Sequence, residues 1–158
     1  MRTIPPTRFG CMLAVMLWCG AAAMTAIAAD ADENASIKAI QTQTKELIDA
    51  LAAFSAEQRD QAIEETETAL DKIDERIDAL QTRIDQNWSR MSATARKEAR
   101  DNMRALRKRR VEVAEWYGSM KNSSADAWKK MKKGFSDAYQ SLADAWKDAA
   151  KAYDASEQ

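Results

Sequence analysis

The chain has 158 residues, enough for one domain, and its 24 Lys and Arg against 25 Asp and Glu give a formal net charge of −1. It has no His, and both its Cys and both its Pro lie within the first 19 residues. The rest of the chain therefore lacks the usual general bases, nucleophiles and soft metal ligands, so we predict no catalytic residue, metal site, cofactor or small-molecule substrate. The nearly neutral charge also gives no support for nucleic-acid binding.

Residues 1–28 have the pattern of a secretory signal peptide. Arg2 and Arg8 form a positive start, residues 11–23 are uncharged and apolar, and Ala26-Ile27-Ala28 fits the small-residue cleavage motif. We expect an exported, periplasmic protein whose mature form is residues 29–158. The alternative is an uncleaved segment that anchors the chain in the inner membrane.

The mature chain should be a single all-helical domain, because it has no Pro and only two Gly, Gly118 and Gly134. The first predicted helix covers 34–54, with apolar residues at helical spacing. Ser55 and Gln58 then form a capping box, which predicts a break and a new helix. The apolar stripe of the first helix consists of Ile37, Ile40, Leu47, Leu51 and Phe54.

The next two elements, 55–88 and 92–121, predict an antiparallel coiled-coil-like hairpin. Each has apolar residues seven apart, which is typical of a coiled coil. If Ile77 faces Leu106 and the other heptad positions pair in the same antiparallel register, the turn falls between Met91 and Ser92. Residues 64–85 carry a net charge of −5 and residues 90–121 a net charge of +6, which favours the same pairing.

The last element, 124–153, is a predicted amphipathic helix with an eleven-residue apolar repeat. Lysines flank the start of its aromatic stripe, so the stripe is a candidate face for contact with a partner or with lipid. The alternative is that the stripe packs onto the hairpin as core. The six residues of the candidate face are Trp128, Met131, Phe135, Tyr139, Leu142 and Trp146.

A basic cluster on the 92–121 helix is a second candidate site. It could contact an acidic partner or anionic headgroups. The interpretation we favour is that it pairs across the hairpin with acidic residues such as Asp74. The cluster consists of Arg104, Arg107, Lys108, Arg109 and Arg110.

The C-terminal half resembles a group of small bacterial helical proteins linked to stress responses. The resemblance rests on Ala127-Trp128, Gly134-Phe135, Ala138-Tyr139 and Ala145-Trp146, and covers roughly residues 62–150. It implies a stress-associated coiled-coil protein with no catalytic residues. Many relatives in this group look cytoplasmic, and the predicted signal peptide is the departure from them.

The sequence thus predicts an all-α, elongated helical bundle: a hairpin with an additional N-terminal helix and a C-terminal amphipathic helix. For function we expect an exported, non-enzymatic coiled-coil protein with a stress-related scaffolding or protein-interaction role, through a protein partner or self-association. One alternative is a peripheral protein that binds a membrane surface through its amphipathic helix. The other is a holdase-like periplasmic chaperone.

Overall fold

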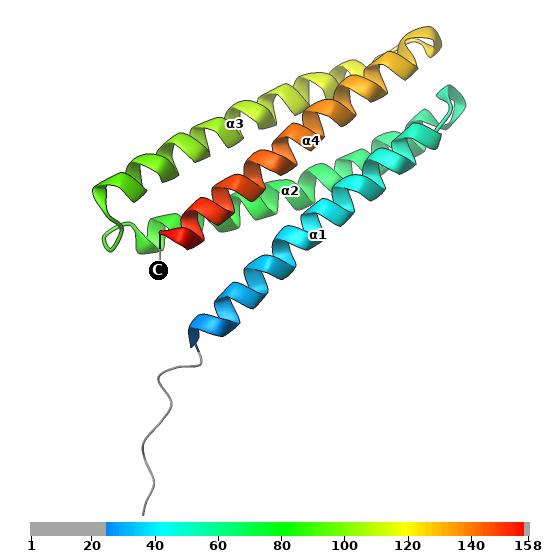
Figure 1. Cartoon of the computed structure of the whole chain (residues 1–158). Helices are drawn as coiled ribbons and strands as arrows, with labels where there is room; N and C mark the ends of the chain where they lie inside the picture. The colour runs from blue at the N-terminus through cyan, green and yellow to red at the C-terminus, as the bar shows by residue number, and fades with distance from the viewer. Residues whose placement is uncertain (1–24, 157–158) are drawn as a thin grey trace, which may run out of the picture.

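The computed structural model describes the backbone of residues 25–156 and the side chains of residues 36–156. Within this range the chain forms four long helices and no strand (Figure 1). They are α1 (Thr25–Ala53), α2 (Arg59–Asn87), α3 (Ala93–Lys121) and α4 (Ala125–Ala155), with a short 3-10 turn, η1 (Ala56–Gln58), before α2. The all-helical bundle predicted from the sequence is confirmed.

Serines begin the helices where the sequence places them. The Ser92 hydroxyl accepts a hydrogen bond from the Ala95 N–H at 3.1 Å, and Ser124 accepts one from Ala127 at 3.3 Å. Both bonds satisfy an N–H group that the first helical turn leaves unpaired. Before α2, the Ser55 N–H donates to the side-chain oxygen of Gln58 at 3.1 Å, as in a capping box.

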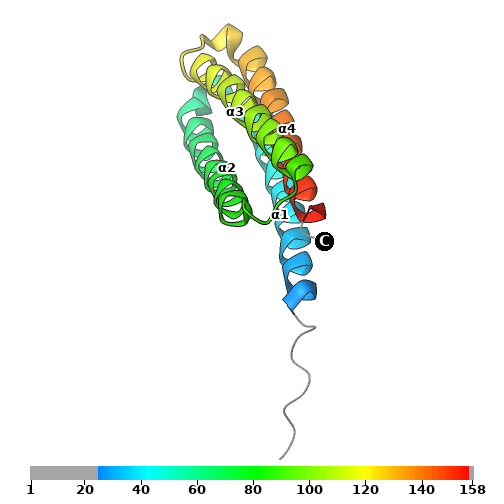
Figure 2. The ribbon, with the colours of Figure 1, turned by 90° about the vertical axis from the view of Figure 1, so that its left-hand side faces the viewer.

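The four helices run up and down the bundle, and α3 and α4 approach each other most closely (Figures 1 and 2). Small residues permit this: an added Cβ at Gly134 would lie 2.3 Å from the ring of Trp116. Alanines from both helices, including Ala99 and Ala149, also line one small space between them. The α2–α3 hairpin is present, but its two helices pack less closely than α3 and α4.

The core is one continuous cluster with contributions from all four helices. α4 supplies most of its large aromatic side chains, including Trp128, Phe135 and Trp146. Helix α1 begins at Thr25, earlier than the predicted 34, and extends beyond the other helices at its N-terminal end (Figure 1). The predicted signal peptide, residues 1–28, lies outside the described residues except for its last four.

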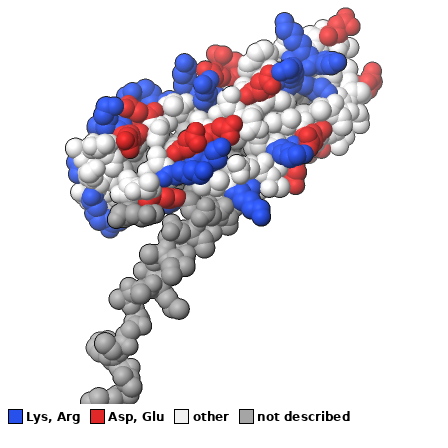
Figure 3. Space-filling view, in the orientation of Figure 1, with Lys and Arg blue, Asp and Glu red and all other residues white. Residues whose placement is uncertain are grey.

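Charged side chains of both signs are intermixed over the face shown in Figure 3. Within residues 25–156, no helix combines the length and the hydropathy needed to cross a bilayer. The apolar side chains of this bundle are directed inward, and the surface is mostly polar and charged.

Candidate interaction groove

The aromatic face predicted from the sequence lies in the interior of the bundle. Five of its six side chains are buried, with Phe135 and Leu142 at 0% exposure, and Met131 is half-buried. Phe135 stacks on Tyr139 with ring centroids 5.7 Å apart. The structure therefore has the core arrangement, and of this face only Met131 is partly exposed.

Three aromatic side chains of α4 donate hydrogen bonds to the backbone of α2. Tyr139, Trp146 and Tyr153 donate to the carbonyl oxygens of Ala69, Arg76 and Arg83 at 3.0, 3.2 and 3.1 Å. Donors and acceptors are both spaced seven residues apart, so we call this set the α4–α2 ladder. A carbonyl oxygen can accept a second bond besides its helical one, and each buried donor is satisfied.

Lys132 continues the same heptad one step earlier, and it is buried at 8% exposure. Its ammonium group donates to the carbonyl oxygens of Leu51 at 2.7 Å and Ala52 at 3.3 Å, and also to that of Phe54. These carbonyls end α1, where a helix leaves its last acceptors unpaired and carries a partial negative charge. Lys132 is therefore a cap for α1 supplied from α4.

The five residues of the predicted basic cluster lie in different environments. Arg110 makes a two-pronged contact with Asp74 of α2 at 2.6 and 2.7 Å, which raises the pKa of Arg110. Arg109 pairs with Glu112 on its own helix at 2.8 Å. The pairing across the hairpin that the sequence favours is present at Arg110, close to its predicted position. Lys108 is exposed, and Arg104 and Arg107 lie at a groove.

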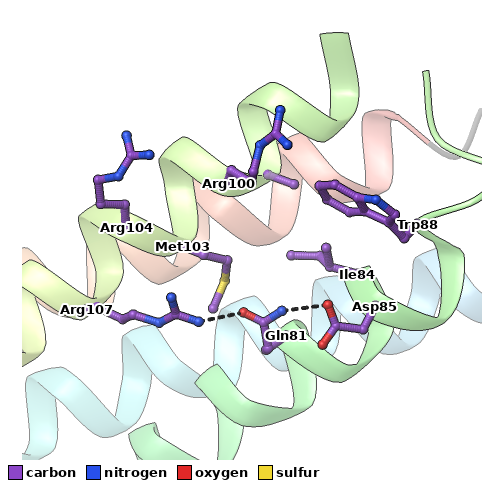
Figure 4. Close-up of a pocket in the computed structure, with 9 residues that line it drawn as sticks. Gln81, Ile84, Asp85, Trp88, Arg100, Met103, Arg104 and Arg107 are labelled. Atoms are coloured by element: carbon purple, nitrogen blue, oxygen red, sulfur yellow. Dashed lines mark hydrogen bonds between the residues drawn. The ribbon is translucent and has the colours of Figure 1, made fainter. Parts of the chain in front are cut away.

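This groove lies between α2 and α3, near the turn that joins them, and has a volume of about 580 Å³ (Figure 4). It exists because α3 packs closely on α4 and less closely on α2. Buried apolar side chains form its floor: Ile84, Ala99 and Met103. Its remaining lining residues are Gln81, Asp85, Trp88, Arg100, Arg104 and Arg107.

The rim of the groove is cationic. Arg100 lies over the Trp88 ring with its guanidinium 5.4 Å from the ring centroid, and Arg107 donates to Gln81 across the mouth at 3.0 Å. Asp85 is the one acid among the lining residues, and it accepts a hydrogen bond from Gln81 at 2.8 Å. Three arginines and one carboxylate line the groove, so its lining carries a net positive charge above an apolar floor.

Sequence reasoning identified two of these arginines but not the groove. Ile84 and Met103 follow the apolar heptads, so they read as ordinary core residues. Trp88 was the available signal, because it lies outside the heptad positions at the end of its helix. These side chains line a groove only because α2 and α3 are spaced apart in the folded bundle.

Within the part of the chain whose side chains are described, no group of three or more Cys, His, Asp or Glu is placed to hold a metal ion. Comparisons with protein-family models, with curated protein sequences and with solved structures find no match to this chain.

Proposed function

We propose that this chain is an exported, non-enzymatic helical-bundle protein of the bacterial envelope that acts as a stress-related scaffold by contacting other proteins. The observation that carries the proposal is the α2–α3 groove, which combines an apolar floor with a cationic rim. Helical proteins commonly recognise partners by taking a side-chain stripe into such a groove. Export and the link to stress rest on the signal-like residues 1–28 and on the resemblance of the C-terminal half.

The test is site-specific photo-crosslinking in cells that express the full chain. A photoreactive phenylalanine analogue replaces Val111, an exposed residue on α3 one turn beyond Arg107. The matched control carries the same analogue at Lys130, exposed on α4. We expect a discrete adduct from position 111 that is absent at position 130, and a partner protein, identified by mass spectrometry, that binds the purified chain. Identical adducts at both positions, or none at either, would contradict the proposal.

Membrane binding through the apolar face of α4 and chaperone activity through an apolar helical surface are the alternatives. The face of α4 is largely buried, and Tyr139 and Trp146 are bonded to α2, so membrane binding through it requires α4 to leave the bundle. Tryptophan emission with anionic vesicles separates the cases. A blue shift that salt weakens would favour lipid binding, and an unchanged spectrum would favour protein contacts. Suppression of client aggregation without ATP would favour the chaperone.

A further inference from the structure

One face of α3 carries three arginines and an exposed valine in line. Arg100, Arg104, Arg107 and Val111 follow one another at steps of four, three and four residues, which places them on one side of the helix. Val111 is 57% exposed, and it is the one large apolar side chain exposed to that extent among residues 36–156. The apolar floor of the groove lies beside this line.

Arg100 and Arg107 contact no carboxylate within the described residues, and Arg104 contacts only an exposed one, unlike their neighbour Arg110. Arg110 is held by Asp74, whereas Arg107 reaches the uncharged Gln81 and Arg100 lies over Trp88. Arg104 pairs with Asp101 at 3.0 Å on its own helix, with side chains that are 77% and 44% exposed. An exposed pair of this kind contributes about 0.2–1 kcal/mol, so an incoming carboxylate can replace it at little cost.

We propose that the α2–α3 groove binds an acidic amphipathic helix of a partner protein. Its carboxylates, spaced three or four residues apart, pair with Arg100, Arg104 and Arg107. Its apolar side chains cover Met103 in the floor and Val111 beyond it. This inference rests on the proposed function and names the chemistry of the partner.

The dimensions fit a helix of ordinary length. Val111 lies eleven positions after Arg100, a distance of about 16 Å at the rise of an α-helix. About three turns of a partner helix cover that distance. A single anionic group would engage one or two of the arginines and would leave Val111 exposed.

The test measures binding of a designed, fluorescein-labelled peptide whose Glu and Leu residues repeat at helical spacing, by fluorescence anisotropy. The protein is purified after expression of the full chain. A scrambled peptide of the same composition removes the amphipathic face. One variant combines Arg100→Glu, Arg104→Glu and Arg107→Glu. The matched control combines Lys129→Glu, Lys130→Glu and Lys133→Glu, which makes the same charge change at exposed positions of α4.

We expect the groove variant to bind the peptide at least about tenfold more weakly, and the control variant to change binding by less than about twofold. Binding should also weaken with salt. Circular dichroism establishes that both variants remain folded. Equal loss in both variants, equal binding of the scrambled peptide, or no binding to the unaltered chain would overturn the inference.

Light scattering of the unaltered chain and of the groove variant measures whether each is a monomer or a dimer. A dimer that the groove variant abolishes would mean that a second copy occupies the groove, and the inference would be wrong. A specific adduct at position 111 together with no binding of the acidic peptide would leave the proposed function standing and reject only the acidic helix as the partner.

Discussion

Tyr139 of α4 donates its hydroxyl hydrogen bond to the backbone carbonyl of Ala69 on α2, 70 positions earlier in the chain. Trp146 and Tyr153 repeat this bond with the same separation. Because the separation is constant, these bonds fix how far α4 can slide along α2. The aromatic rings are buried in the core, and their polar atoms define the register of α4 against α2.

Replacing Tyr139 by Phe should remove the hydrogen bond and retain the buried ring. We expect the free energy of unfolding to fall by about 0.5–1.5 kcal/mol, measured by urea titration followed by circular dichroism. Ala69 retains its helical bond in the variant, so the loss should stay within that range. A variant as stable as the unaltered chain would show that this bond does not stabilise the bundle.

The same tyrosine predicts a dependence of stability on alkaline pH. Burial raises the pKa of Tyr139 to about 12, above an ordinary tyrosine value of about 10. The folded chain holds this proton more tightly, so the stabilisation is complete below the unfolded pKa and is lost as the pH rises through the folded one.

We therefore expect the free energy of unfolding to decrease between about pH 10 and pH 12, and Tyr139→Phe to make that decrease shallower. Urea titrations at successive pH values measure it, and phenolate absorbance follows the ionisation. Part of the slope should remain in the variant, because burial also raises the pKa of Tyr117. An identical slope in both proteins would contradict the assignment to Tyr139.

The two glycines of the helical region give a matched pair of substitutions. Alanine at Gly118 meets nothing within 4 Å, so Gly118→Ala should stabilise the chain by about 0.5–1 kcal/mol through helix propensity. Alanine at Gly134 would collide with the ring of Trp116. Gly134→Ala should therefore cost about 1–3 kcal/mol through overpacking. Thermal unfolding compares the two, and stabilisation by Gly134→Ala would mean that α3 and α4 separate readily.

Lys132 and Lys133 form a second matched pair on α4. Lys132→Met would leave the end of α1 without its ammonium donor, and we expect a loss of about 1–3 kcal/mol in the free energy of unfolding. Lys133 makes an exposed pair with Asp137, so Lys133→Met should change stability by less than about 0.5 kcal/mol. Equal effects of the two substitutions, measured by urea titration, would argue against the cap.

The sequence was sufficient for the three breaks between the helices because these depend on local chemistry. Ser92 and Ser124 satisfy N–H groups only three residues away, and the breaks follow from such short patterns. The start of α1 was predicted too late, at 34 instead of Thr25. Alanine-rich sequence favours helix without an apolar stripe, and the prediction relied on the stripe.

The neighbours of each helix could not be read from the sequence. Heptads in α2 and α3 predict that both have an apolar face, but they do not say which helix fills it. The close approach of α4 to α3 depends on the absence of a side chain at Gly134 beside Trp116. Lys132 is one of the lysines that flank the start of the aromatic stripe, and only the folded bundle brings the end of α1 to its ammonium group.

The position of α4 in the chain has a consequence for synthesis. A ribosome makes α4, which supplies most of the aromatic core, after α1, α2 and α3, and the bonds of α4 to α2 join residues 70 positions apart. Such distant contacts form late, because a long loop must close first. The emerging chain therefore contains α1, α2 and α3 before the aromatic side chains that they pack around have been made. Chains truncated before Trp128 should therefore fail to fold and be degraded by proteases.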